Sequence, residues 1–188
     1  MSIEIDEIRR ILSRCTISNG YSDIEVVKSF AVKNPVAAFN AIWEVLTATE
    51  DPGCDDGPLC FELLTLAATT IGRTSLEQRL LCEWDQHSDG VHRNLINGIA
   101  SKEVISFDCA KQLFNRPTTR VRQRHRIVAT LVSCRHDFPS KEILELARGI
   151  GVYDEPERQI ILVQFLQSVA ANYRDEIGDA TMQRIKVK

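Results

Sequence analysis

Apolar residues recur along most of this 188-residue chain at intervals of three and four positions, and this spacing limits the fold more than any other feature. In the segment 35–49, for example, one helix face carries Phe39, Ile42, Trp43 and Leu46. Alternating apolar and polar runs of strand length are nearly absent, and no Asn-Gly turn joins two such runs. The pattern therefore predicts an all-α protein.

Helix-boundary residues refine the prediction. Pro35 and Pro156 stand where the first turn of a helix tolerates proline, because the missing N–H would be unpaired there anyway. Thr74-x-x-Glu77 has the spacing of a capping box, and Gly72 stands where a helix ends. Together these signals predict helices at residues 2–15, 22–32, 35–49, 58–72, 74–87, 91–99, 102–115, 118–135, 140–149, 156–173 and 176–184.

A short motif recurs at intervals of about 40 residues. A glutamate, two aliphatic residues, a variable residue and an apolar residue occur at Glu62–Leu66, Glu103–Phe107 and Glu142–Leu146, with a fainter copy at Glu25. Each copy follows a longer predicted helix, so the repeating unit is a helix pair. This length is expected of HEAT and armadillo units.

With this motif, the sequence resembles the HEAT/armadillo class of α-helical repeat proteins over most of its length. The resemblance implies a short α-solenoid of stacked antiparallel helix pairs, in which neighbouring pairs cover each other's apolar stripes. An irregular all-α bundle is the alternative. In the solenoid interpretation, residues 1–188 form a single all-α domain. It has N-terminal capping helices at 1–34, helix-pair repeats at 35–153 and a C-terminal cap at 154–188.

Positive charge is concentrated in the segment 111–153, which carries nine basic and three acidic side chains. Its centre contains the candidate partner-binding residues Arg116, Arg120, Arg122, Arg124 and Arg126. In a helix, an apolar line through Val121, Val128 and Val132 separates these arginines into two groups. Two interpretations stay open: the arginines flank a buried face and form internal salt bridges, or they form a surface for an anionic partner.

An acidic segment at 50–57 adds Asp51, Asp55 and Asp56 as candidate partner-binding residues. A calcium loop of the EF-hand type is excluded, because Asp56 occupies the position at which that loop needs glycine. A solvated loop that contacts a partner fits the composition better.

No motif for catalysis, metal or cofactor binding is present. The sequence contains no phosphate-binding glycine loop, no G-x-G-x-x-G and no H-E-x-x-H. Cys82, His87 and His92 follow one another at five-residue steps, which do not place ligands on one helix face. The six cysteines form no C-x-x-C pair, so we expect mostly buried, reduced thiols. We expect no catalytic residue, no metal site and no cofactor.

The four consecutive aliphatic residues 160–163 surround a full turn of the predicted helix 156–173. We expect this half-helix to be covered on nearly every side, by other helices or by a second copy of the chain, which makes it a candidate homo-oligomer interface. The run is far shorter than the ~20 apolar residues of a membrane span. Without a signal-like N-terminus, the chain is expected to be cytoplasmic and to have no membrane partner.

These features favour a non-catalytic protein–protein interaction module, an adaptor or an inhibitor of the immunity type, that binds a protein on its concave face. The alternative is a nucleic-acid-binding HEAT-like protein, including a DNA glycosylase. The HEAT-like glycosylases use aromatic residues and an aspartate on a basic concave face, and the resemblance would assign these roles to Trp84, Asp85 and Asp89 with the arginines. However, Trp84 has the spacing of a core residue, and the chain has a net charge of −3.

Overall fold

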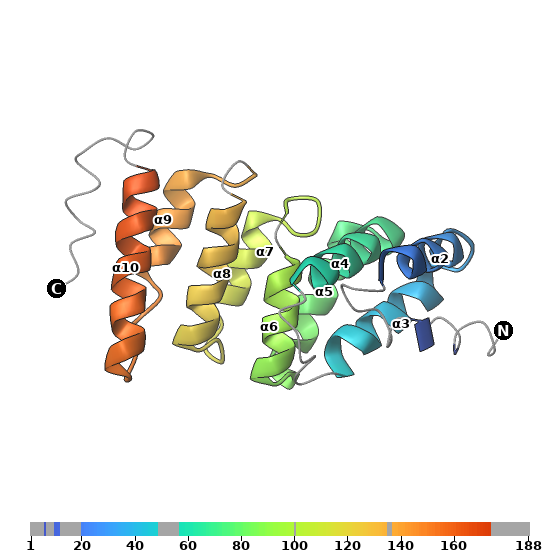
Figure 1. The fold of residues 1–188 in the computed structure, drawn as a ribbon, viewed down its shortest axis with the longest axis horizontal. Coiled ribbons are helices and arrows are strands. Elements are labelled where there is room, and N and C mark those ends of the chain that lie inside the picture. The colour runs from blue at the N-terminus through green and yellow to red at the C-terminus, as the bar shows by residue number, and fades with distance from the viewer. Residues whose placement is uncertain are drawn as a thin grey trace. The chain divides into compact units, whose positions relative to one another are not determined.

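The computed structural model describes residues 6, 10–11, 20–48, 57–99, 101–134 and 137–173. All regular structure within these ranges is helical, which confirms the all-α prediction (Figure 1). The helices are α2 (Gly20–Lys33), α3 (Pro35–Ala48), α4 (Gly57–Ile71), α5 (Arg73–Glu83), the short 3₁₀ helix η1 (Trp84–Gln86), α6 (Asp89–Gly98), α7 (Phe107–Asn115), α8 (Val121–Ser133), α9 (Ser140–Arg148) and α10 (Pro156–Asn172). The expected helix 176–184 and most of 2–15 lie outside the described residues.

The helix expected at 102–115 begins five residues later, at Phe107. Residues 101–106 form a turn, and the Ser106 hydroxyl accepts a hydrogen bond from the Cys109 amide at 3.2 Å, which caps α7. Glu103, which begins the middle copy of the repeated motif, therefore lies in a turn, whereas Glu62 and Glu142 lie within α4 and α9. The three copies do not occupy equivalent structural positions.

The capping box expected at Thr74 and Glu77 is wrong. Helix α5 already begins at Arg73, and its N-cap is Gly72 at φ 86°, a conformation that favours glycine. The Glu77 carboxylate instead accepts a hydrogen bond from the Ser106 amide at 2.6 Å. The local sequence pattern assigns the Glu77 carboxylate to capping the start of α5. In the structure, this carboxylate binds the distant Ser106 amide instead.

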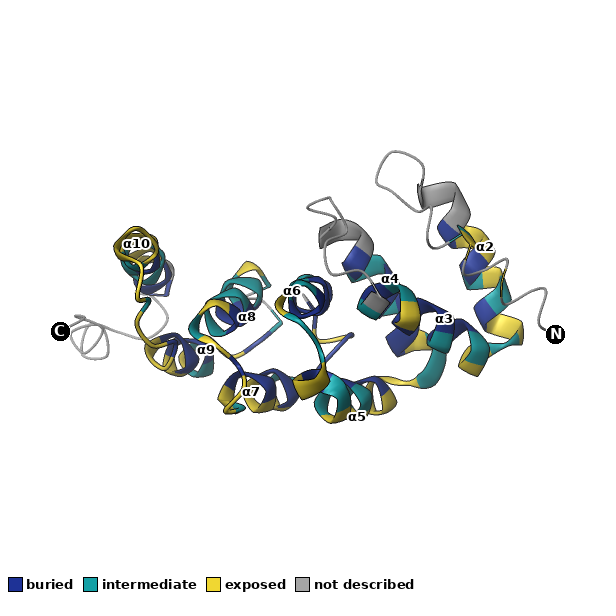
Figure 2. Ribbon diagram, turned by 90° about the horizontal axis from the view of Figure 1, so that it is seen from below, coloured by how far each residue is buried: buried dark blue, intermediate teal, exposed yellow. Residues whose placement is uncertain are grey.

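The chain divides into two compact units, an N-terminal unit of residues 1–109 and a C-terminal unit of residues 110–188. In the N-terminal unit, α4 is the central helix and contacts α2, α3, α5 and α6. Gly98 allows α6 to cross α4 closely, because a Cβ atom there would lie 2.7 Å from the Cys60 carbonyl oxygen and overlap the Leu64 side chain. The buried residues lie mainly on the faces that these helices turn toward one another (Figure 2).

The predicted core of the N-terminal unit is confirmed for both tryptophans. Trp43 and Trp84 are buried, and so are the residues that share the helix face with Trp43. The cysteine prediction holds in part. Cys60 and Cys109 are buried and Cys134 is half-buried, but Cys82 is exposed on α5, and all four are free thiols.

In the C-terminal unit, α9 contacts both α8 and α10. Gly149, at the end of α9, lies against the ring of Phe114, where a Cβ atom would be 3.2 Å from Cε1. Gly151 has φ +101° and lies against α8, with Val121 Cγ2 only 3.2 Å from the position of a Cβ atom. Two glycines therefore hold the loop between α9 and α10 close to the body of this unit.

Other helices of the described structure do not cover residues 160–163 on nearly every side, so that alternative of the prediction is wrong, whereas cover by a second copy of the chain stays a prediction. Leu162 is 1% exposed, but Ile160 and Ile161 are 59% and 58% exposed. The reason is that α10 buries one stripe, made of Leu162, Val169 and Ala170, against the rest of the unit. The isoleucines fall outside this stripe. In the described part of the chain, no helix is both long and apolar enough to cross a membrane.

Candidate functional site

Helix α8 carries most of the arginines that the sequence singles out. Its buried residues are Gln123, Ile127, Val128 and Leu131, while Val121 and Val132 are only partly covered. The buried face is therefore rotated away from the apolar line that the sequence suggests. The polar Gln123 is buried because its side-chain oxygen accepts a hydrogen bond from the Arg120 amide at 2.7 Å, which satisfies a free backbone donor at the helix start.

Arg124, Arg120 and Arg116 have structural contacts within the C-terminal unit. Arg124 is half-buried: its Nε donates to the Phe114 carbonyl oxygen at 3.2 Å, and its guanidinium group lies 5.5 Å from the centre of the Phe114 ring. Arg120 is the N-cap residue of α8, although its side chain is exposed. Arg116 is half-buried in the loop before α8, where its carbonyl oxygen accepts from the Thr119 amide.

Arg122 is exposed and Arg126 is half-buried one turn further along α8, and the positive charges of both influence the pKa of Tyr153, in the loop before α10. Burial raises the pKa of the Tyr153 phenol, and the positive charges of Arg158, Arg122 and Arg126 oppose that rise. The negative charge of Glu155 raises the pKa of the same hydroxyl. Three guanidinium groups from α8 and α10 and the Glu155 carboxylate therefore contribute to the electrostatic environment of Tyr153.

His125 of α8 contacts both Tyr153 and α10. Its Nδ1 forms a hydrogen bond of 3.1 Å with the Tyr153 hydroxyl, and its ring lies 4.7 Å from that of Phe165 on α10. Burial lowers the pKa of His125, and the neighbouring Arg126 lowers it further. The imidazole is therefore mainly neutral near neutral pH, and it contributes packing and a hydrogen bond rather than a fourth positive charge.

The start of α10 adds an anchored arginine and an apolar group. Arg158 forms an ion pair with Glu155 at 3.3 Å, and both side chains are about half exposed. The Tyr153 amide donates to the Gln159 side-chain oxygen at 2.9 Å, which fixes the loop against α10. Ile161 is exposed one turn beyond Arg158. We call the group of Arg122, Arg126, Tyr153, Arg158 and Ile161 the α8–α10 surface.

The sequence identifies only the α8 half of this surface. Tyr153 and Arg158 lie 20 and 25 residues beyond the end of α8 at Ser133 and belong to no basic run. One signal could have indicated them: two helices separated by one antiparallel helix begin at the same end, so the starts of α8 and α10 are brought together. Asp51, Asp55 and Asp56, the acidic candidates, lie outside the described residues.

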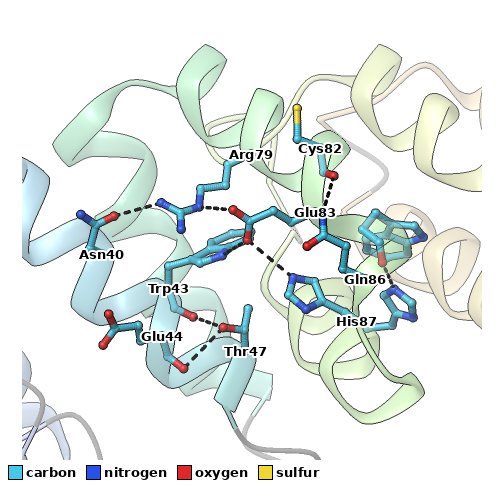
Figure 3. A network of polar contacts seen from close by, with 11 residues as sticks. Asn40, Trp43, Glu44, Thr47, Arg79, Cys82, Glu83, Gln86 and His87 are labelled. Carbon is cyan, nitrogen blue, oxygen red and sulfur yellow. Dashed lines mark hydrogen bonds and ion pairs between the residues drawn. The ribbon is translucent and has the colours of Figure 1, made fainter.

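A second polar cluster, which the sequence does not indicate, joins α3 to α5 in the N-terminal unit (Figure 3). Glu83 accepts from Arg79 Nε at 2.8 Å through one carboxylate oxygen and from Trp43 Nε1 at 2.6 Å through the other. Arg79 also donates to the Asn40 side chain at 2.9 Å and lies over the Trp43 ring. Both carboxylate oxygens are thus engaged, and the cluster stabilises the helix packing rather than offering a free base.

The histidines of the N-terminal unit do not form a metal site. His92 is buried, its Nε2 lies 2.7 Å from the Trp84 carbonyl oxygen, and its ring packs 4.1 Å from that of Trp84. His87 Nε2 is 3.9 Å from Glu83, beyond hydrogen-bond distance, and Cys82 is exposed. No group of three potential metal ligands occurs in the described ranges.

The chain matches no protein-family model, no curated protein and no solved structure. The α8–α10 surface is therefore interpreted from its own chemistry.

Proposed function

We propose that this protein is a non-catalytic interaction module that binds an acidic surface of a protein partner through the α8–α10 surface. The observation that carries the proposal is that Tyr153 joins α8 to α10, through its 3.1 Å hydrogen bond with His125 and its 2.9 Å hydrogen bond to Gln159. Exposed Arg122 on α8 and Arg158 on α10 lie near these two anchor points in the chain. Arginine presents five N–H donors in a planar fork that matches a carboxylate. Arg122 forms no ion pair or hydrogen bond with the described residues, so it is free to bind a partner.

The composition of the surface favours a protein partner. Tyrosine and arginine are among the residues enriched where a few side chains dominate the binding energy of a protein interface. Ile161 supplies an exposed apolar group beside the charges, and a mixture of apolar centre and polar rim is typical of protein interfaces. The arginines would increase the rate of association with an acidic partner and set its orientation.

Nucleic acid binding is the alternative, and two observations count against it. Glu155 is paired with Arg158, and exposed Asp154 and Glu157 lie beside them, so phosphates would meet carboxylates on the same surface. Trp84, the aromatic residue that a glycosylase-like scheme requires, is 0% exposed and is covered by His92. Its ring is not available to stack on a base.

The proposal includes a short α-solenoid as the scaffold that presents this surface. Support comes from the contacts of α9 with the helices on either side of it in the chain, α8 and α10. Small-angle X-ray scattering tests the arrangement, because a compact protein of this length has a radius of gyration of about 16 Å. A clearly larger value supports an elongated solenoid, and a value near 16 Å supports the bundle.

Amide chemical shifts of the isotope-labelled protein test the proposed binding. A glutamate-rich peptide is titrated into the protein, and single-stranded DNA of similar charge is titrated into a second sample. We expect the peptide to shift the amides of Arg122, Arg126, Tyr153 and Ile161, and we expect the effect to weaken as salt is raised.

The matched control exchanges two lysines of the same unit. Lys111 and Lys141 are both exposed and lie outside the α8–α10 surface, so K111E/K141E changes the net charge by the same amount as R122E/R126E. Peptide binding should persist in the lysine variant and disappear in the arginine variant. Equal losses in both variants would mean that only net charge matters. Tighter binding of the DNA at the same residues would replace the proposal with the alternative.

A further inference from the structure

The N-terminal unit contains a cavity of about 580 Å³ between α2 and α4. This volume lies within the range of small-molecule sites. One side is formed by residues of α4 at helical spacing, and the other side is formed by α2 and the start of α3. The lining residues used below are Lys28, Ala31, Val32, Glu62, Thr65 and Leu66.

Two polar groups in this cavity form no hydrogen bond or ion pair with the described residues. The Glu62 carboxylate is half-buried and forms neither an ion pair nor a hydrogen bond there. The Thr65 hydroxyl, one turn further along α4, has essentially no contact with solvent and no hydrogen bond. Buried polar groups are normally paired, because an unpaired one costs free energy. Side chains three positions apart on a helix are neighbours, so Glu62 and Thr65 lie on the same side of α4.

The nearby cation is already paired. Lys28 Nζ lies 2.7 Å from the Glu25 carboxylate, and the pKa of Lys28 is raised mainly by this hydrogen bond. Glu62 also acts on Lys28, but no ion pair joins the two side chains. Lys28, Glu25 and Glu62 together carry one net negative charge, and this charge is located at Glu62. The cavity therefore favours a cation over an anion.

The remaining walls are mainly apolar. Ala31 and Leu66 are buried at the sides, and Val32 is 85% exposed at the end of α2. An aliphatic chain placed against these residues would be removed from water, and so would the exposed methyl groups of Val32. The cavity thus combines an unpaired carboxylate and hydroxyl with an aliphatic wall.

We propose that the cavity between α2 and α4 binds an organic cation with an aliphatic body, whose ammonium or guanidinium group is bound by Glu62 and Thr65. An ammonium group has three N–H donors, so it can donate to the carboxylate and to the threonine hydroxyl together. The aliphatic body packs against Ala31, Leu66 and Val32. The cation comes from a free small amine or from a lysine or arginine side chain of a peptide.

Amide chemical shifts again provide the test, with three probes of equal chain length: hexylammonium, hexanol and hexanoate. We expect hexylammonium to shift the amides of the cavity residues at millimolar concentration, and to bind more tightly than the other two probes. Equal binding of hexanol, preferred binding of hexanoate, or no binding of any probe would overturn the proposal. This comparison uses the wild-type protein and does not depend on a variant that folds.

A blocked peptide with one lysine between two leucines distinguishes the two sources of the cation. If the peptide binds more tightly than hexylammonium at the same residues, the cation comes from a peptide. If hexylammonium binds and the peptide does not, the ligand is a free amine. Either result supports the proposed chemistry.

Substitutions then test whether Glu62 supplies the negative charge that binds the cation. Glu62→Gln should weaken hexylammonium binding by about two- to fivefold, the effect of losing one partly exposed ion pair. Lys28→Gln removes the opposing charge and should strengthen binding. Glu103→Gln, an exposed carboxylate of the same unit outside the cavity, should leave it unchanged. Unchanged binding in Glu62→Gln, with a native amide spectrum, would contradict the assigned role.

Discussion

The exposure of the isoleucine pair on α10 gives the sharpest test of the described packing, because neighbouring residues have opposite environments. Ile161 is 58% exposed and Leu162 is 1% exposed. Fully burying such a side chain contributes about 1.5–3 kcal/mol, so the buried fraction of Ile161 contributes about 1 kcal/mol at most. Ile161→Asp should therefore lower the free energy of unfolding by about 1 kcal/mol or less.

Leu162→Ala is the matched comparison. Removal of a buried leucine side chain costs about 2–5 kcal/mol, because the lost contacts and the remaining cavity add together. Urea unfolding followed by circular dichroism measures both variants, at two protein concentrations. We expect Leu162→Ala to shift the midpoint to lower urea by at least twice as much as Ile161→Asp, with no dependence on concentration.

The result that would refute the reasoning is a large loss of stability in Ile161→Asp. If this variant is as unstable as Leu162→Ala, the isoleucine is covered in solution. If its deficit also grows with protein concentration, the cover is a second copy of the chain, because association stabilises the folded state by mass action. That outcome would restore α10 as an oligomer interface and remove Ile161 from the α8–α10 surface.

Three further changes test other parts of the structure. Thr65→Val should raise the free energy of unfolding by about 1 kcal/mol in urea titrations, because a buried hydroxyl without a partner is removed at nearly constant volume; a loss of stability would show that the hydroxyl is paired. Gly151→Ala should lower it by about 1–2 kcal/mol through the positive φ, and by more than Gly72→Ala, because at 151 a Cβ atom also meets a methyl group of α8. The pKa values of His87 and His125 are both lowered by burial below the ordinary value of 6.5, so the unfolded chain binds protons more readily. Stability should be complete above pH 6.5 and fall as the pH decreases below it; the fall should be smaller when both histidines are replaced by asparagine, and an unchanged pH profile would contradict their burial.

Much of the helical structure could be predicted because its causes are local. Apolar spacing places Phe39, Ile42 and Trp43 on one face, and that face is buried. Short-range signals failed where a distant group competed for the same atoms. Glu77 has the position of a capping residue, but it binds the amide of Ser106 in the turn before α7. Local sequence contains no information about that turn.

The candidate site was predictable only in part for the same reason. The run of arginines on α8 is visible in the sequence, but the contacts that half-bury Arg124 against Phe114 are not. The partners of the others depend on tertiary packing. Tyr153 and Arg158 reach α8 only after α9 has reversed the chain, and Ile161 is exposed although its neighbours are aliphatic. The burial of each residue of α10 depends on the helices packed beside it, and the four aliphatic residues 160–163 do not by themselves indicate it.

The central claim is that the α8–α10 surface binds an acidic protein, and comparative affinity capture tests it most directly. Three baits are immobilised at equal density: the wild-type protein, R122E/R126E and the charge-matched K111E/K141E. Nuclease-treated lysate is passed over each bait, and the bound proteins are identified and quantified by mass spectrometry. The account predicts a protein with an acidic surface that is held by the wild type and by K111E/K141E and is lost from R122E/R126E. Retention of the same proteins by all three baits, or the absence of any acidic protein held by the wild type, would contradict it.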